Sequence, residues 1–339
     1  MSHIPQDFMD VSRDIGADGL LIQGAGGNTS IKIGANLMWV KASGKWLQHG
    51  DREDIFAAVD WSRVNGNIGA GHDDPTKGAV LPMAGDGLRP SIETTLHSLM
   101  PHDVVFHTHS INTIVHAIQQ DAVGIMSPKL DGIQWGFVPY SKPGLQLTRL
   151  VSDVLAARHC DVLVIQNHGL VVGGDSPAET LTLMRDVETR LVATPRPLST
   201  PSLEPLAEAC SNTNFVIAAS DIIHQLALNS HGFELARSGS LYPDHVVFLG
   251  SGIAGVETMQ EFTSFCRAGT DDPLRPKAIA LKGMGVVHDK SLSSGGIEML
   301  TALAQVIRRA PGHMQPRYLS RSEEQDLVNW DAEKYRQTL

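Results

Sequence analysis

The sequence predicts an α/β layered fold followed by a second, smaller α/β domain, and three observations lead to this expectation. The chain of 339 residues, 42% of them hydrophobic, can bury more than one core. Residues 1–193 alternate strand-like apolar segments with segments of helical periodicity. A Pro-rich stretch over 194–205 predicts a linker. We therefore expect one domain over 1–193 and a C-terminal α/β domain over 206–339.

The elements of the first domain follow from local patterns. Strand character marks residues 32–44, 103–110 and 161–174. Helical spacing marks residues 91–100 and 177–193. Between them, residues 65–90 are rich in Gly, Pro and Asp and predict a long surface loop that could act as a lid over a site.

Composition excludes several classes of protein. A formal net charge of −10, with no basic stretch interleaved with aromatics, argues against a nucleic-acid partner. No apolar run has the length of a membrane span, and the amino terminus lacks the pattern of a secretory signal. The cysteines, Cys160, Cys210 and Cys266, are far apart and odd in number, which fits neither a disulfide framework nor a paired-cysteine zinc site. We expect a cytoplasmic protein.

The two halves share a pattern that suggests an internal duplication. The tripeptide VVF occurs in both halves, at 104–106 and at 246–248, and each half has a later pair of glycine and an apolar residue, at 169–170 and at 285–286. Their alignment places His107 against Leu249, His109 against Ser251 and His168 against Met284. The hypothesis is a degenerate second copy without metal ligands. Chance similarity between short Val- and Gly-rich strand ends explains the pattern about as well. A comparison of strand orders separates the two explanations.

Three histidines predict a metal site. His107 and His109 end an apolar strand, and the period of two places both imidazoles on one face. His168 also follows an apolar strand and precedes Gly169, where the backbone can approach a ligand closely. Three imidazoles are typical of an open catalytic zinc site. The alternative is that they are hydrogen-bonded structural histidines. Four other histidines lack this pattern and are interpreted as structural or surface residues: His97, His102, His116 and His159.

Glu93 is the candidate acid/base. It lies in a segment where Ser91 is expected to cap a helix and Glu93 to sit in the first turn, above a buried stripe of Ile92, Leu96 and Leu99. Acidic residues also favour helix starts because of the helix dipole, so the pattern by itself leaves both roles open.

The glycine-rich segment over 24–30 is not a dinucleotide fingerprint, because Thr29 replaces the third glycine and a strand, not a helix, is expected to follow. Its amides could form an anion nest, joined by the turn Ala42-Ser43-Gly44 and the helix start at Ser91. Tight turns between strands explain both stretches equally well.

In order along the chain, GGNTS, VKASG, RPSIET, HTH and NHGL resemble the class II aldolase/adducin family. The second half, with YPDHV, PKAIALKGMGV and LSRSEEQDLVNWDAEKY, is similar to the aldolase part of bifunctional rhamnulose-phosphate aldolase/dehydrogenases. The resemblance implies a mixed central sheet flanked by helices. It also implies a homo-oligomer, commonly a tetramer, that acts on a small sugar-like substrate.

The resemblance assigns roles to individual residues. His107, His109 and His168 would bind Zn²⁺, with Mn²⁺ or Co²⁺ as alternatives, and Glu93 would serve as the acid/base. The residues expected to face the substrate's phosphate are Gly27, Asn28, Ser43, Gly44 and Ser91. The implied reaction is a reversible retro-aldol cleavage of a ketose phosphate or a related sugar or sugar acid, through an enediolate stabilised by zinc.

Two departures from the family pattern limit this assignment. Ile92 stands where phosphate aldolases usually have a second serine, so a non-phosphorylated substrate is an alternative. Tyr140 matches a different family tyrosine from the proton donor, which stays unassigned. Three other functions stay open: a decarboxylase or epimerase that uses the same metal site, a non-catalytic adducin-like structural protein, and a regulatory module that senses a metabolite.

Overall fold

The computed structural model describes residues 3–83, 87–268 and 272–328. The described chain divides into two compact units. Unit 1 comprises residues 3–117 and 121–192, and unit 2 comprises residues 118–120 together with the described part of 193–328. In these described ranges, no helix combines the length and the apolar character that crossing a membrane would require.

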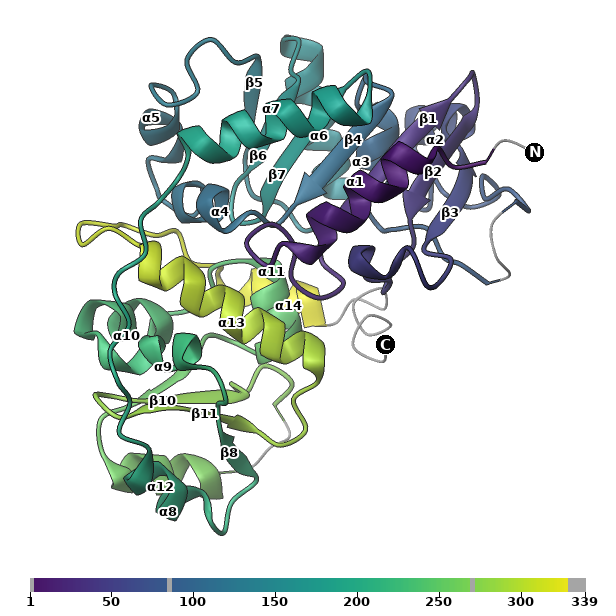
Figure 1. Ribbon diagram of the computed structural model, residues 1–339. Helices are drawn as coiled ribbons and strands as arrows, with labels where there is room; N and C mark the ends of the chain where they lie inside the picture. The colour runs from purple at the N-terminus through teal and green to yellow at the C-terminus, as the bar shows by residue number, and fades with distance from the viewer. Residues whose placement is uncertain (1–2, 84–86, 269–271, 329–339) are drawn as a thin grey trace. The chain divides into compact units, whose positions relative to one another are not determined.

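Unit 1 is built on a mixed seven-stranded sheet in the order β3-β2-β1-β4-β7-β6-β5 (Figure 1). Its strands are β1 Asn28–Ile33, β2 Leu37–Lys41, β3 Phe56–Asp60, β4 Val104–Thr108, β5 Trp135–Val138, β6 Val162–Ile165 and β7 Gly169–Gly174. Its helices are α1 Gln6–Ala17, the short 3₁₀ helix η1 Leu47–His49, α2 Trp61–Gly69, α3 Thr94–Leu99, α4 Ile111–Ala117, α5 Ala122–Met126, α6 Leu145–Ala157 and α7 Pro177–Arg190.

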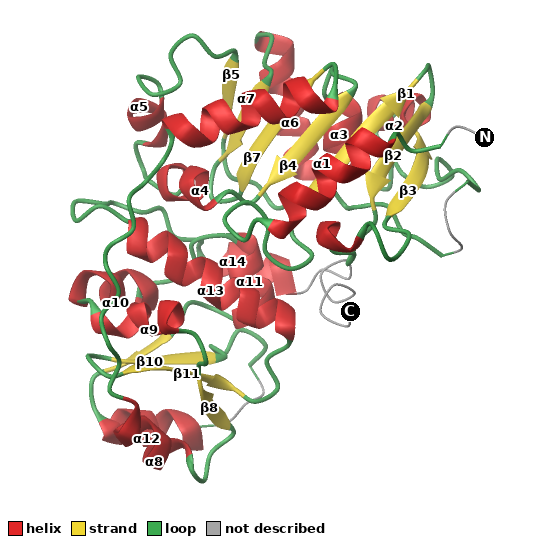
Figure 2. Ribbon diagram, in the orientation of Figure 1, coloured by secondary structure: helices red, strands yellow, loops and turns green. Residues whose placement is uncertain are grey.

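Apolar side chains on both faces of this sheet explain why it is covered by helices on both sides (Figure 2). Along β4, Val104 and Phe106 belong to the core beneath α1 and α7, whereas Val105 belongs to the core beneath α3 and α6. Because side chains alternate along a strand, His107 points to the same face as Val105. The sheet therefore directs this histidine toward α3, the helix that follows Glu93.

Several predicted elements differ in their boundaries. The expected strand over 32–44 contains the end of β1, a turn and β2, and the segment 161–174 is a hairpin of β6 and β7. The loop expected over 65–90 begins inside α2, and its residues 84–86 lie outside the described ranges. Likewise α8 begins at Leu203, inside the stretch expected to be a linker.

Unit 2 contains a four-stranded sheet in the order β8-β11-β10-β9. Its strands are β8 Phe215–Ile217, β9 Ala254–Val256, β10 Ala278–Leu281 and β11 Gly285–Asp289. Its helices are α8 Leu203–Cys210, α9 Asp221–Leu228, α10 Ser230–Arg237, α11 Pro243–Leu249, α12 Met259–Arg267, α13 Ser294–Arg309 and α14 Arg321–Val328.

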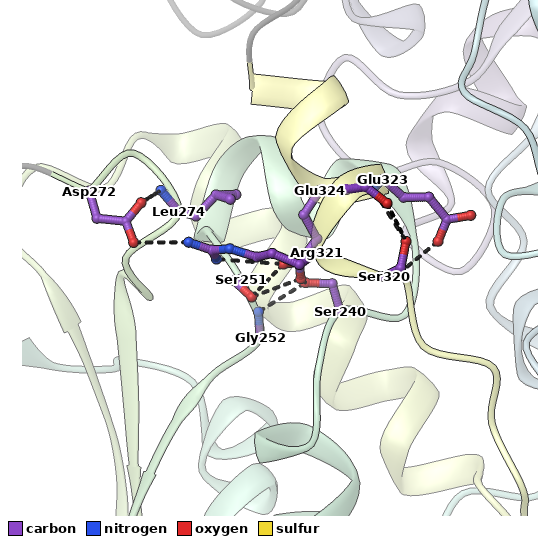
Figure 3. Close-up of polar contacts among 10 residues, drawn as sticks. Ser240, Ser251, Gly252, Asp272, Leu274, Ser320, Arg321, Glu323 and Glu324 are labelled. Carbon is purple, nitrogen blue, oxygen red and sulfur yellow. Dashed lines mark hydrogen bonds and ion pairs between the residues drawn. The ribbon is translucent and has the colours of Figure 1, made fainter.

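The last described helix, α14, is attached to unit 2 through a buried carboxylate (Figure 3). Glu324, 3% exposed, accepts hydrogen bonds from the hydroxyls of Ser240 (2.7 Å) and Ser251 (2.8 Å). Arg321 lies 3.8 Å from the same carboxylate and 3.2 Å from Asp272. A buried carboxylate needs such donors to offset its loss of hydration, so this cluster fixes where α14 packs.

The strand order of unit 2 repeats part of unit 1. The order β4-β7-β6-β5, with two antiparallel pairs followed by a parallel pair, matches β8-β11-β10-β9. The turns agree as well, since His168 N donates to Ile165 O at 3.1 Å and Met284 N donates to Leu281 O at 3.0 Å. Different strand orders would have ended the duplication hypothesis, and the orders are the same. The duplication itself stays a prediction.

One part of the predicted alignment is wrong. Val246–Phe248 lie in helix α11 and are not the counterpart of strand β4. The strand registers equate His107 with Ile217, because these residues pair with Val171 of β7 and Val287 of β11 at the same place in each sheet. By the same register His109 corresponds to Ala219 and His168 to Met284. A short apolar run suits a strand or a buried helix equally, which misled the alignment.

Candidate metal centre

The three predicted histidines come together at one edge of the sheet of unit 1. His107 lies in β4, His109 follows that strand, and His168 lies in the turn between β6 and β7. The ring centroids are 5.0–5.1 Å apart. One nitrogen from each ring lies within 4.8 Å of the others, and all three residues are buried. The spacing allows the three rings to share one ion.

Backbone contacts set the orientation of these rings. The Nδ1 atom of His107 lies 3.0 Å from the carbonyl oxygen of Leu170. A hydrogen bond from Nδ1 to a carbonyl leaves the Nε2 lone pair available as a ligand. Asn167, with φ of +53°, is the one non-glycine residue of the described chain with positive φ, and it lies in the turn between β6 and β7, directly before His168. Asparagine tolerates this conformation better than most residues.

Glycines let the backbone approach the three histidines closely. A Cβ atom on Gly169 would lie 2.3 Å from the carbonyl oxygen of Thr108, the residue between His107 and His109. A Cβ atom on Gly26 would lie 2.8 Å from Nδ1 of His109. The glycine-rich segment predicted to form an anion nest therefore packs against the histidines, with β1 following it as expected.

Glu93 faces the same centre. Its carboxylate oxygens lie 3.4 Å from Nε2 of His107 and 3.3 Å from Nε2 of His168, and the residue is 5% exposed. Burial raises the pKa of Glu93, but the nearby charges of the three histidines and a hydrogen bond from Asn28 outweigh it and lower the pKa to about 2. The group is a carboxylate at neutral pH.

The helix begins two residues later than predicted. Helix α3 begins at Thr94, with Glu93 at the N-cap position and Ser91 before it. The Oγ atom of Ser91 accepts a hydrogen bond from the amide of Glu93 at 3.2 Å. Leu96 is buried as expected, whereas Ile92 and Leu99 are half-buried. This turn directs the Glu93 side chain toward the sheet instead of along the helix.

Sequence reasoning assigned Asn28 to the substrate's phosphate and missed its contact with Glu93. The side-chain amide of Asn28 donates to Oε2 of Glu93 at 2.8 Å and to Oγ of Ser91 at 3.2 Å. Its carbonyl oxygen contacts Nε2 of His97, whose Nδ1 lies 2.7 Å from Oγ of Ser30. Burial, the largest cause, lowers the pKa of His97 to about 3, so the ring is neutral. The spacing of four residues from Glu93 to His97 on a helix was the available signal.

The other predicted substrate residues lie in neighbouring loops. Ala42 bridges to Pro90, and the amide of Ser43 donates to the carbonyl of Arg89 at 2.8 Å. Ser43 and Gly44 are half-buried, and Gly44 has φ of +76°. These bonds place the turn at 43–44 beside the segment that leads to Ser91.

Comparison with known proteins identifies the family. The sequence profile of the family described as Class II Aldolase and Adducin N-terminal domain matches residues 6–192, more than half of the chain. The chain belongs to the class II aldolase and adducin family. The mixed sheet with flanking helices is the fold expected from that resemblance, and membership supports an enzyme of the aldolase, epimerase or decarboxylase type with a divalent metal and a small sugar-like substrate.

Individual relatives of this class II aldolase family member are distant. The protein named Uncharacterized oxidoreductase YuxG, from Bacillus subtilis, is 27% identical over 191 residues, which cover 51% of this chain and 27% of that protein. The chain therefore spans about a quarter of the length of this curated relative.

Among solved structures, a class II aldolase domain from Thermoplasma acidophilum is 22% identical, with a TM-score of 0.46, over 56% of this chain and 94% of that one. The putative aldolase/epimerase/decarboxylase YgbL from Klebsiella pneumoniae is 19% identical, with a TM-score of 0.42, over 62% and 93%. An L-fuculose 1-phosphate aldolase from Glaciozyma antarctica is 15% identical, with a TM-score of 0.38, over 55% and 69%.

Proposed function

We propose that unit 1 is a zinc-dependent aldolase that performs reversible retro-aldol cleavage of a ketose phosphate or a related sugar or sugar acid. The observation that carries this proposal is a buried carboxylate, Glu93, held 3.3 and 3.4 Å from the Nε2 atoms of His168 and His107. This arrangement combines an ion-binding ring of imidazoles with a proton-transfer group in one enclosed place.

The donor set fits a transition-metal ion. His107, His109 and His168 would hold it through imidazole nitrogens, a set that suits Zn²⁺, with Mn²⁺ or Co²⁺ as alternatives. The hydrogen-bonding of His107 through Nδ1 leaves the opposite nitrogen for coordination. When bound, the cation supplies positive charge beside the substrate carbonyl oxygen, where negative charge develops as the carbon–carbon bond breaks.

Glu93 moves the proton. In the cleavage direction the Glu93 carboxylate takes the proton of the hydroxyl whose carbon becomes the aldehyde. The electron pair of the broken bond stays on the carbon next to the carbonyl, and Glu93 returns the same proton to that carbon. In the condensation direction it removes the same proton as a carboxylate, the form that its lowered pKa favours. Transfer by a positioned side chain typically contributes about 10²–10⁴-fold. The hydrogen bond from Asn28 to Oε2 fixes the direction of the carboxylate.

The loops around the Glu93 carboxylate bind the substrate in this proposal. We assign it to Gly27, Ser43, Gly44 and Ser91, which supply amides and hydroxyls near the start of α3. Both N–H donors of the Asn28 side chain are directed at Ser91 and Glu93, so its role is to position the base. With fewer donors left for a phosphate, a free sugar or sugar acid is the preferred substrate class.

The assembly and location follow from the same resemblance. We propose a homo-oligomer, a tetramer by analogy with family members, that works in the cytoplasm. The three cysteines are free, which is compatible with a reducing compartment.

The test is Glu93→Gln, with Glu208→Gln, an exposed carboxylate of α8, as the matched control. Purified protein is assayed for bound metal and for aldehyde release from ketose phosphates, free ketoses and sugar acids. We expect Glu93→Gln to keep its metal and lose at least about 10²-fold in turnover, while the control keeps both. Equal turnover for Glu93→Gln and the parent would discard the assignment.

Product analysis separates the alternatives. Carbon dioxide release would reassign the reaction to a decarboxylase, and stereochemical inversion without cleavage would reassign it to an epimerase. A protein that is purified without metal and regains none when zinc is added would instead support an adducin-like structural role.

A further inference from the structure

A second cluster of metal-ligating side chains lies at the other edge of the sheet of unit 1. His102 lies two residues before the first residue of β4, and Asp161 directly precedes β6. His159 lies two residues before Asp161. Strands β4 and β6 both run antiparallel to β7, which lies between them. Their starts therefore share one edge, and their ends carry the His107 centre at the opposite edge.

One carboxylate oxygen joins the two imidazoles. The Oδ1 atom of Asp161 lies 2.9 Å from Nε2 of His102 and 2.9 Å from Nε2 of His159. The ring centroids are 5.8 Å apart, and the three candidate ligand atoms lie within 4.8 Å of one another. In a tetrahedral site with zinc bonds near 2.0–2.1 Å, ligand atoms are separated by about 3.3 Å. If the carboxylate oxygen and the two imidazole nitrogens moved apart by a few tenths of an ångström, an ion would fit between them.

A glycine in the strand between makes this arrangement feasible. A Cβ atom on Gly173 of β7 would lie 2.2 Å from Nδ1 of His102. The imidazole of His102 therefore crosses β7 at a position without a side chain. The amide of Gly173 also donates to the carbonyl of Asp161 at 2.7 Å, which fixes the backbone that carries the carboxylate. His102 is 8% exposed, so its ring is held in place by packing.

The site has room for further ligands. The side chain of His159 is 63% exposed and that of Asp161 is 31% exposed. A surface cavity of about 490 Å³ is lined by His159 and Cys160. Three protein ligands with an open side leave positions for water, as in zinc sites with incomplete protein coordination.

We propose that His102, His159 and Asp161 bind a divalent transition-metal ion, with zinc as the preferred one, at a site separate from the His107 centre. Two imidazoles and one carboxylate suit Zn²⁺, Co²⁺ or Ni²⁺, whereas Mg²⁺ and Ca²⁺ prefer all-oxygen ligands. The bound ion links the start of β4 to the start of β6 across β7. It stabilises the two strands whose far ends hold the histidines of the first centre.

The experiment measures the number of zinc ions bound per chain. Tag-free full-length protein is stripped with a chelator, dialysed against zinc at pH 7.5 and analysed for metal per chain. We expect two equivalents for the parent, one for His159→Ala, and one for His107→Ala/His109→Ala. The control His313→Ala, which removes an exposed histidine of unit 2, keeps two.

Two further measurements distinguish this site from the first centre. His159→Ala should keep the turnover of the parent, and its melting temperature in chelator should match that of the parent, because the side chain is exposed. Its melting temperature in zinc should rise less than that of the parent. Equal zinc content in His159→Ala and in the parent would overturn the second site. A parent protein that binds two zinc ions per chain but has no aldolase activity would instead refute the proposed function and leave the second site intact.

Discussion

Replacing Gly27 with alanine tests how closely the glycine-rich segment supports the ligands. Gly27 has φ of +57°, and a Cβ atom there would lie 2.3 Å from Cδ1 of Ile22 and 2.7 Å from the carbonyl oxygen of His107. The carbonyl belongs to the backbone of β4, so relief of the overlap must move the strand that carries a ligand. An L-residue in this conformation costs about 1–2 kcal/mol, and overpacking adds about 1–3 kcal/mol. The expected loss of unfolding free energy is about 2–5 kcal/mol.

Gly34→Ala is the matched control. Gly34 has φ of +63°, and a Cβ atom there would meet nothing within 4 Å. It lies in the turn between β1 and β2, close in sequence to Gly27. This variant carries only the conformational cost of about 1–2 kcal/mol. The difference between the two variants therefore measures the contact with Ile22 and His107.

Urea unfolding of both variants, followed by circular dichroism with zinc and with chelator, gives the two free energies. Gly27→Ala should be the less stable by about 1–3 kcal/mol and should also bind zinc more weakly than Gly34→Ala. Equal stability and equal zinc affinity would show that β4 does not depend on this contact, and the reasoning would fail.

Three further predictions concern the base, the acid sensitivity of unit 2 and the repeated sheet. Asn28→Ala removes a hydrogen bond that lowers the pKa of Glu93, so the acid limb of the pH–rate profile should move to higher pH; an unchanged limb would contradict the role of Asn28. Burial lowers the pKa of His245 to about 4. Because the unfolded chain takes up this proton near pH 6.5 and the folded one does not, unfolding free energy should fall by up to about 1.4 kcal/mol per unit as pH drops from 6.5 to 4. Urea titrations should show a smaller fall for His245→Asn, and an equal fall would contradict the assignment. A variant with histidine at all three positions matched by strand register, Ile217, Ala219 and Met284, should bind one additional zinc ion per chain. A variant with histidine at the three positions matched by sequence alignment, Leu249, Ser251 and Met284, should bind no additional zinc.

Local patterns predicted the first sheet well where period and composition agreed. The helix over 177–193 formed close to its expected bounds, because its apolar spacing suits a helix only. The strand that ends at His107-Thr108-His109 also formed close to its expected bounds. The predicted boundaries were wrong where a turn interrupts an apolar run, as between β1 and β2. The predicted type of element was wrong where an apolar run suits both a strand and a helix, as in α11.

The candidate site shows the same division. The placement of the histidines was predictable, because they stand at the ends of two apolar strands: His107 and His109 at β4, and His168 after β6. The role of His97 was not, because its link to Glu93 runs through Asn28, a residue 69 positions away in the chain. His102 and His159 were interpreted as structural or surface residues for a similar reason. Their proximity depends on Gly173 and on the antiparallel order of three strands, which no local spacing encodes.

By itself, the sequence determined which residue types stand at strand ends, and hence that imidazoles and a carboxylate were available in unit 1. Only the tertiary structure decided which of them meet, because strand order brings together atoms that are far apart along the chain. The same is true of unit 2, where the strand registers, and not the similarity of short segments, set Ile217, Ala219 and Met284 against the three histidines. Side-chain alternation is a local property, whereas register is fixed by packing across the whole sheet.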